Sequence, residues 1–226
     1  MHPFCIIILT IVLKEIILDI EHDEKANKHF IDFCRLSCAD IDVLPSMLNE
    51  FEKNYKSRSP IWWYTKESFI YSGLNKALRT QDTEIIIKMG FFLRDLHRQI
   101  EQLHSEAHET RNMILYRGQG MLHAYFERMK ESKNSLVSFN SFLSTSSDRI
   151  VALGFARSSK DNPGHIGVLF QMNVDPSISS APFASLDYTS YYLHQEKEIL
   201  FSMHTVFRVG KMEQVEDELW QVTLTL

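Results

Sequence analysis

Apolar residues recur at steps of three and four in the first half of the sequence, which is the spacing of one face of an α-helix. The clearest case is DTEIIIKMGFFLRDLHRQIEQLHSEAHE, where Asp82 is placed to cap the start of a helix. KESFIYSGLNKALR predicts a second helix, and SCADIDVLPSMLNEFEKNY contains a third that opens near Pro45. Between them, SRSPIWWYT is expected to be a connector in which Trp62 and Trp63 pack. The apolar stripe of the long helix is Ile85 or Ile86, Met89, Phe92 or Leu93, Leu96, Ile100 and Leu103.

The pattern changes in the second half, where short runs rich in β-branched and aromatic residues predict strands. Turn signals such as KDNPGH and DPSIS separate several of them, and helices do not alternate regularly with them. This order predicts an α+β fold with an antiparallel-rich sheet, in which a helical region at 1–110 belongs to the same domain as a β core at 111–226. Short helices are expected at 121–130 and 149–156. The expected strands are MILYRG, SFNSFLSTS, IGVLFQMNV, KEILFSM, TVFRVG and LWQVTLTL.

Composition and charge exclude one class of partner and leave secretion open. The 226 residues carry a formal net charge of -5, which leaves no basic footprint for duplex nucleic acid. The apolar amino end, MHPFCIIILTIVLKEIILDI, is interrupted by Lys14 and Glu15, so its uncharged run is too short to span a bilayer. It lacks the basic region and cleavage site of a signal peptide, so a buried strand or helix is favoured over a secretory leader.

The cysteine count predicts no disulfide framework. Cys34 and Cys38 lie one helical turn apart, and two buried thiols are favoured over a metal or redox pair because no second ligand pair lies nearby. The sequence also has no Asn-x-Ser/Thr acceptor for glycosylation. These features favour a cytoplasmic over a secreted protein.

Two motifs fit known sites only in part. GQGMLH offers Gly118 and Gly120 after a strand, but His123 stands where a dinucleotide fold needs a third small residue. HSEAH places His104 and His108 on one helical face, but a zinc protease needs a glutamate directly after the first histidine. We therefore predict neither a dinucleotide-binding fold from GQGMLH nor a zinc site from HSEAH.

Three other segments carry polar residues at strand ends. In ILYRGQG, Arg117 can fork onto a phosphate pair and Gly118 can let the backbone come close to a ligand, although a surface turn is an equal alternative. In FLSTSS, the hydroxyl residues 144–147 could orient another side chain or bond a ribose, and Ser147 or Asp148 could instead cap the next helix. In HQEKEILF, the period of two puts Glu196 and Glu198 on one strand face, which suits either a solvated edge or a working pair of carboxylates.

The order of these segments resembles the Arg–Ser–Glu class of mono-ADP-ribosyltransferases, which is related to cholera-toxin-like and clostridial-toxin-like enzymes. The residues that carry the resemblance are Tyr-Arg-Gly, then SFLSTSSDRIVALGFA, then EKEILFSMHTVFRV, within Met113 to Leu226. WWYT and LNKALR in the first half resemble the amino-terminal helices of animal members, especially invertebrate ones. The resemblance implies an antiparallel-rich split β-sandwich with short helices after an N-terminal helical subdomain, with 111–226 as the NAD-binding catalytic core.

The resemblance also implies a role for each residue of the site. Glu198 bonds the ribose 2′-hydroxyl and stabilises an oxocarbenium-like state, Arg117 grips the phosphates of NAD or NADP, and Ser144 holds Glu198. The implied NAD-binding residues are Arg117, Gly118, Ser144, Thr145 and Ser146, with Phe155 at the nicotinamide pocket. NAD is a substrate in this reaction, and the family implies no metal.

Glu196 carries the prediction of the acceptor. Members with two glutamates modify arginine, since the second carboxylate can orient the guanidinium and accept its proton, whereas members with Gln at that position modify other residues. The implied partner is a protein with an exposed arginine. Tyr191 and Tyr192 precede the pair and either read that partner or pack. The alternatives are an NAD glycohydrolase and an inactive NAD-binding or interaction module.

Overall fold

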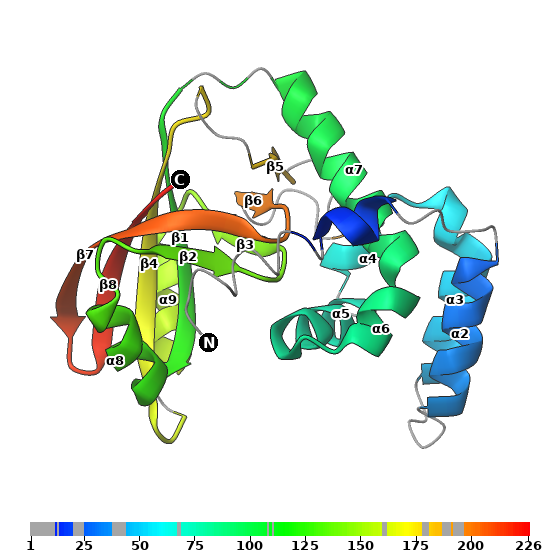
Figure 1. Ribbon diagram of the computed structural model, residues 1–226, viewed down its shortest axis with the longest axis horizontal. Helices are drawn as coiled ribbons and strands as arrows, with labels where there is room; N and C mark the ends of the chain where they lie inside the picture. The colour runs from blue at the N-terminus through cyan, green and yellow to red at the C-terminus, as the bar shows by residue number, and fades with distance from the viewer. Residues whose placement is uncertain are drawn as a thin grey trace.

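The helices of the first half gather at one end of the molecule, and the strands lie at the other end together with two later helices (Figure 1). The computed structural model describes residues 12, 14–19, 25–37, 44–66, 69–107, 109, 111–159, 162–177, 181–186, 191 and 197–226. The amino-terminal stretch is therefore described only in part, as a helix over 14–19 in which Ile17 is buried. The helices of the first half are α2 (Ala26–Ser37), α3 (Leu44–Asn54), the 3₁₀ helix η1 (Tyr55–Ser57), α4 (Pro60–Thr65), α5 (Phe69–Thr80), α6 (Thr83–Lys88) and α7 (Gly90–Ala107).

The helices predicted from the apolar stripes are present, with two corrections. The long stripe is divided into α6 and α7, because the backbone leaves the helical region at Met89 (φ -91°, ψ 4°) and Gly90 has a low helix propensity. Asp82 caps α6 as predicted, accepting a hydrogen bond from the backbone N–H of Ile85 at 3.2 Å. The expected connector SRSPIWWYT contains helix α4, because Ser59 accepts from the N–H of Trp62 at 3.1 Å and Pro60 suits the first helical position.

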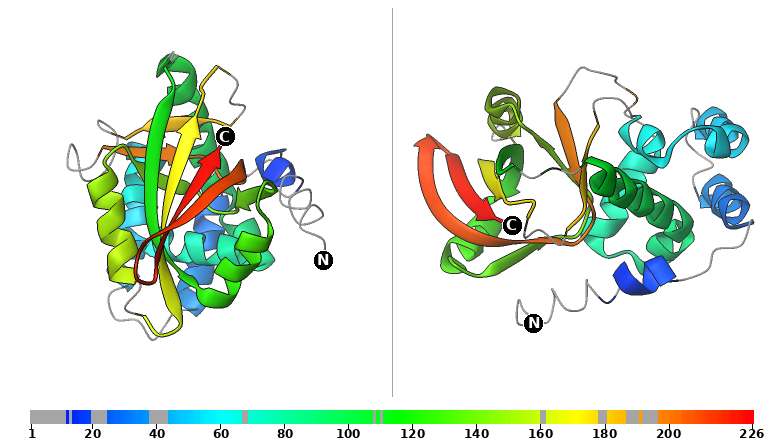
Figure 2. Two further views of the ribbon diagram at one scale, coloured as in Figure 1. Left: turned by 90° about the vertical axis from the view of Figure 1, so that its left-hand side faces the viewer. Right: turned by 90° about the horizontal axis from the view of Figure 1, so that it is seen from above.

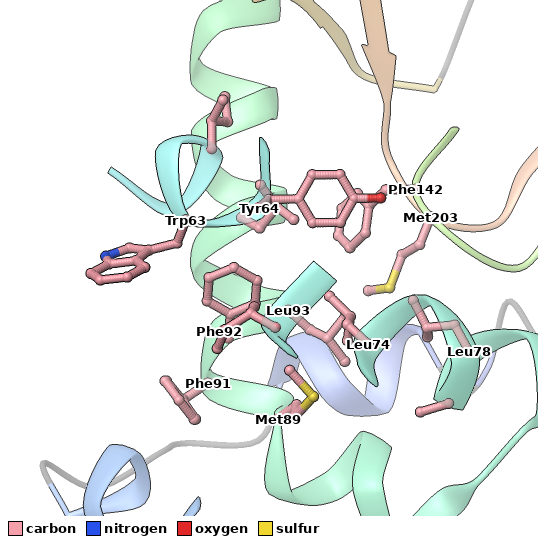
Figure 3. Close-up of a cluster of buried hydrophobic side chains, with 14 of the residues drawn as sticks. Trp63, Tyr64, Leu74, Leu78, Met89, Phe91, Phe92, Leu93, Phe142 and Met203 are labelled. Carbon is pink, nitrogen blue, oxygen red and sulfur yellow. The ribbon is translucent and has the colours of Figure 1, made fainter. Parts of the chain in front are cut away.

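Buried aromatic and aliphatic side chains hold these helices together and attach them to the strands. Figure 3 shows Trp63, Tyr64 and Phe92 in this core, with Phe142 and Met203 entering it from the strand half. The rings of Tyr64 and Phe142 are 5.5 Å apart. Trp63 is 2% exposed, so its predicted packing role is confirmed. Cys34 is likewise buried, while Cys38 lies outside the described residues.

The strands form a mixed, mostly antiparallel sheet in the order β2-β7-β8-β4-β1-β3-β6-β5. Among the described residues, β4 and β8 are the parallel pair, and the other pairs are antiparallel. This arrangement confirms the α+β prediction. The strands are β1 (Met113–Leu122), β2 (Leu136–Phe139), β3 (Leu143–Ser146), β4 (His165–Val174), β5 (Phe183–Ser185), β6 (Glu198–Phe201), β7 (Thr205–Glu216) and β8 (Leu219–Thr225).

The sheet is divided where β1 meets β3, since their pairing is limited to Tyr116 opposite Ser146. On one side lie β2, β7, β8, β4 and β1, and on the other β3, β6 and β5 (Figure 2). Alternation along β6 sends Leu200 into the helical core and Phe201 into a second core between the two parts of the sheet. The expected strand SFNSFLSTS is therefore two strands, β2 and β3, which belong to different parts.

Two short helices accompany the strands, close to where they were predicted. Helix α8 (His123–Glu131) begins later than expected because β1 continues to Leu122. Helix α9 (Arg149–Ser159) follows the serines and lies along β1 and β4 (Figure 1). Among the described residues, none of the helices combines the length and apolar character that a bilayer crossing requires.

Candidate functional site

A cavity of about 340 Å³ lies between the helical half and the strands. Helices α4 and α5 contribute one wall, and β1, β3, β6 and α9 contribute the others. Arg117, Ser144 and Glu198, which are far apart in the sequence, all line it. Glu196 lies outside the described residues. The lining residues are Tyr64, Thr65, Tyr71, Tyr116, Arg117, Gly118, Ser144, Thr145, Ser146, Val151, Ala152, Phe155 and Glu198.

Strand register explains why these residues meet. Strand β3 pairs with β1 on one side and with β6 on the other, and Ser146 lies directly opposite Glu198. Because side chains alternate along a strand and opposed residues share a face, Ser144 and Ser146 project on the same side as Glu198. Ser144 is diagonal to Glu198 in this register, so its hydroxyl contact with that carboxylate stays a prediction.

Arg117 is held by the neighbouring strand. Its Nη1 donates to the carbonyl oxygen of Ser144 at 2.8 Å, and its Nε donates to Oε1 of Gln119 at 3.1 Å. A guanidinium has five N–H groups, so the remaining three have no hydrogen-bond partner in the described part of the chain and can receive an anion. Ser144 thus positions Arg117 through its backbone, a contact that the sequence pattern did not indicate.

The Arg117 guanidinium is desolvated in the cavity wall. Burial is the main cause that lowers the pKa of Arg117 below its ordinary value, and the positive charge of Arg79 adds to this effect. Tyr71, Tyr64 and Glu198 act in the opposite direction. Arginine keeps its proton under these conditions, so the cavity contains a partly desolvated cation that an anionic ligand would stabilise.

The hydroxyl residues after Ser144 fix the end of β3 and the start of α9. Thr145 donates through Oγ1 to the carbonyl of Ile199 at 2.8 Å, so its hydroxyl stabilises the β3–β6 pair even though the residue lines the cavity. Ser146 Oγ accepts from the N–H of Asp148 at 3.0 Å, and Asp148 accepts from the N–H of Ile150 at 2.8 Å. Of the two residues predicted to cap α9, the structure uses Asp148.

Gly118 lines the cavity and also lies under helix α9. A Cβ at this position would lie 1.8 Å from the carbonyl oxygen of Ala152, so the glycine is needed for the close approach of α9, and its contact with a ligand stays a prediction. The next glycine of GQG, Gly120, lies opposite Gly167 on β4, and a Cβ on either would also meet α9 residues at less than 3.0 Å. Because these three positions have no side chain, helix α9 can pack directly against the sheet. Phe155 of α9 then lies at the cavity.

Several lining residues were not predicted. Tyr64 is buried and donates to Oδ1 of Asn75 at 3.2 Å, and burial raises the pKa of its phenol, which stays protonated. Tyr71 stands edge-to-face on Tyr64 with ring centroids 5.3 Å apart and is 42% exposed. Tyr64 lies in the segment that was expected to be a connector and Tyr71 lies in a predicted helix, and the sequence gives no signal that either side chain faces the strands. Phe155, which was predicted, lies at the cavity with 55% of its surface exposed.

Comparison with known proteins assigns this architecture to a family. The family model described as ADP-ribosyltransferase exoenzyme matches residues 48–225, a range that begins within α3 and includes the later helices and strands. Comparison with curated proteins finds no match.

Solved structures of ADP-ribosyltransferases share the fold at low sequence identity. The ADP-ribosyltransferase Vis from Vibrio splendidus has a TM-score of 0.58 and 18% identity, over 91% of this chain and 85% of that chain. HopU1 of Pseudomonas syringae has a TM-score of 0.58 and 16% identity, over 90% of this chain and 98% of that chain. The C3 exoenzyme of Clostridium limosum has a TM-score of 0.54 and 14% identity, over 74% and 82%.

Proposed function

The chain belongs to the ADP-ribosyltransferase exoenzyme family, whose enzymes use NAD as substrate, and we propose that it transfers ADP-ribose from NAD to arginine side chains of an acceptor protein. One observation carries the proposal: Arg117, Ser144 and Glu198 stand on three neighbouring strands and line one cavity. The animal subtype is part of the proposal and rests on the WWYT and LNKALR segments.

The cavity has the size of a small-molecule site and the charge to bind an anionic ligand. Its volume of about 340 Å³ falls in the range of small-molecule sites. In the proposed complex, the three N–H groups of Arg117 that have no partner in the described chain bind the diphosphate, because a guanidinium can donate two parallel hydrogen bonds to phosphate oxygens. Arg79, whose charge acts on Arg117, adds to the positive potential there.

Glu198 is proposed as the catalytic carboxylate. NAD supplies the glycosidic bond between nicotinamide and ribose, and cleavage of such a bond develops positive charge on the sugar. Glu198 accepts a hydrogen bond from the ribose 2′-hydroxyl and stabilises that charge more strongly in the transition state than in the ground state. The β3–β6 ladder holds Glu198 opposite Ser146, so little reorganisation is needed at the moment of reaction.

Arginine is proposed as the acceptor because of Glu196, two positions before Glu198. A guanidinium is a poor nucleophile while protonated, and a second carboxylate can orient it and accept its proton during attack. A structure of Vis in complex with agmatine, which carries a guanidinium group, supports the proposal of a guanidino acceptor for this chain.

The Glu196→Gln variant tests the choice of acceptor. We expect it to lose transfer of ADP-ribose to agmatine by about 100-fold, as is typical for loss of general-base catalysis, while hydrolysis of NAD persists. Mass spectrometry of agmatine and release of nicotinamide measure the two activities. Glu213→Gln, at a carboxylate of β7 that does not line the cavity, is the matched control and should keep both.

The wild-type protein distinguishes the alternatives in the same assay. Nicotinamide release without labelling of agmatine would replace the proposal by an NAD glycohydrolase. Binding of NAD without release would replace it by an inactive module.

A further inference from the structure

Tyr191 is attached to a distant part of the chain. Its backbone N–H donates to Oγ1 of Thr65 at 2.8 Å, and its ring stands edge-to-face on Trp62 with centroids 5.2 Å apart. The ammonium of Lys66 lies 5.7 Å from the centroid of Tyr191 and 5.1 Å from that of Trp62. We name Trp62, Thr65 and Lys66 the α4 ledge. Three different kinds of contact therefore fix one residue that is 41% exposed.

The α4 ledge is itself anchored to the neighbouring helices. At the start of α4, the N–H of Ile61 donates to Oε1 of Gln99 on α7 at 2.9 Å, and Ile61 is fully buried. At its end, Lys66 bonds both carboxylate oxygens of Glu50 on α3 at 2.7 Å. Helix α4 lies against α7 (Figure 1). Because both ends of α4 are bonded to other helices, the α4 ledge can hold Tyr191 in one position.

The α4 ledge and the cavity wall have one residue in common, Thr65. Thr65 contacts Tyr191 and also lines the cavity, whereas Trp62, Lys66 and Tyr191 do not line it. Tyr191 precedes Glu198 by only seven positions, and the catalytic strand begins at Glu198. The ledge therefore fixes a residue that lies seven positions before Glu198 in the sequence. Arg117, Ser144 and Glu198 are held separately, by the ladders of β1, β3 and β6.

We propose that Trp62 and Lys66 are positioning residues for acceptor transfer, acting through Tyr191, and that cleavage of NAD does not depend on them. This inference rests on the proposed function, because it assumes that an acceptor is bound beside Glu198. The strand ladders set the geometry of the groups that act on NAD. The α4 ledge holds Tyr191, which precedes both glutamates in the sequence.

A double-mutant cycle between Trp62→Leu and Tyr191→Leu tests the proposal. We expect each single variant to lower kcat/KM for transfer to agmatine about tenfold, because a small misplacement of reacting groups is costly, while hydrolysis of NAD stays within about twofold. The double variant should transfer about as slowly as either single variant, since both remove one coupled contact. Trp62→Phe, which keeps an aromatic ring, should restore most of the transfer.

Trp220→Leu is the matched control. Trp220 is also partly buried, packs on Phe126 with centroids 5.2 Å apart and lies 4.2 Å from the ammonium of Lys130, but it does not line the cavity. It should leave the ratio of transfer to hydrolysis unchanged. An equal loss of transfer and hydrolysis in Trp62→Leu, no loss of either, or additive losses in the double variant would overturn the proposal.

Hydrogen exchange at the backbone amide of Tyr191 separates this proposal from the proposed function. We expect about tenfold faster exchange in Trp62→Leu than in the wild type, and no change in Trp220→Leu. If the wild type modifies no guanidino compound, the proposed function fails. Faster exchange in Trp62→Leu would then show only that the α4 ledge fixes Tyr191. The proposed role of Trp62 and Lys66 in acceptor transfer would be refuted together with the proposed function. Unchanged exchange overturns the ledge itself, whatever the acceptor is.

Discussion

Arg117 illustrates how a single residue can bind a ligand and fix its own position. Its contact with the Ser144 carbonyl uses a backbone atom, so it survives changes of the serine side chain. Its contact with Gln119 joins two residues of the same strand. Both contacts orient the planar guanidinium in a wall where it is partly desolvated, and this orientation leaves its other N–H groups for an anion.

Arg117→Lys should therefore weaken NAD binding even though it keeps the charge. An ammonium cannot donate to Ser144 and Gln119 while also presenting a planar fork to a diphosphate. We expect KM for NAD to rise about 10- to 100-fold, as for loss of a bidentate contact. Arg208→Lys is the control, because exposed Arg208 also bonds a backbone carbonyl, that of Asn134 at 3.0 Å, and its KM should not change. An unchanged KM in Arg117→Lys would refute the phosphate-binding role.

Among the elements, the position of helix α9 depends on how closely its backbone can approach the sheet. The Gly118 and Gly167 backbones lie under α9, where small Ala152 and Ala156 face them. This close packing places the start of α9 at the end of β3, where Asp148 caps the helix and bonds Ser146. The GQG segment thus serves helix–sheet packing beside the site.

Gly118→Ala should be strongly destabilising. The new Cβ would meet the backbone of Ala152 at 1.8 Å, and a backbone atom cannot move aside without shifting α9. We expect the free energy of unfolding to fall by about 2–3 kcal/mol in urea titration, the upper part of the range for overpacking. Gly154→Ala on the open side of α9 meets nothing within 4 Å and should stabilise by about 0.5–1 kcal/mol. Equal effects of the two substitutions would contradict this account of the packing.

The sequence predicted elements where local chemistry decides them and missed features that depend on distant contacts. Asp82 signals a helix start by itself, and the apolar stripe after it signals a buried face. The break at Met89 was missed because the stripe continues through it. Tyr64 and Tyr71 were missed as site residues because their place in the cavity wall depends on how the helical half lies against the strand half. The site residues on β1, β3 and β6 could be named through the family resemblance, while their pairing required the strand register.

At the scale of the whole molecule, two buried histidines lie where the helices meet the strands. His97 of α7 shares a hydrogen bond with Ser202, Nδ1 to Oγ at 2.6 Å. The ring nitrogens of His204 have no hydrogen-bond partner within the described residues. Burial lowers the pKa of His97 and of His204 to about 4, and the charge of Lys14 adds to this lowering. Both histidines are therefore neutral in the folded protein at neutral pH.

Stability should consequently decrease in mild acid. The unfolded chain binds protons at both histidines near pH 6.5 and the folded chain only near pH 4, so the free energy of unfolding is highest above pH 6.5 and falls between these values. The loss is on the order of 3 kcal/mol for each histidine.

Urea titrations of the wild type and of the double variant His97→Gln/His204→Asn measure this loss. Asparagine is chosen at position 204 because it suits the left-handed backbone of His204 (φ 59°). The double variant should lose less stability than the wild type between pH 7 and pH 5, and exposed His123→Gln should behave as the wild type. Equal slopes for all three proteins would contradict the assignment.

The most direct test of the account is release of nicotinamide from NAD by the wild type and by Glu198→Gln. Glutamine keeps the shape of the side chain and removes the charge that stabilises the developing sugar cation. We predict that the wild type releases nicotinamide, that Glu198→Gln lowers kcat at least about 100-fold with little change in NAD affinity, and that Glu213→Gln matches the wild type. Turnover by Glu198→Gln equal to that of the wild type would contradict the claim that this cavity is the catalytic site.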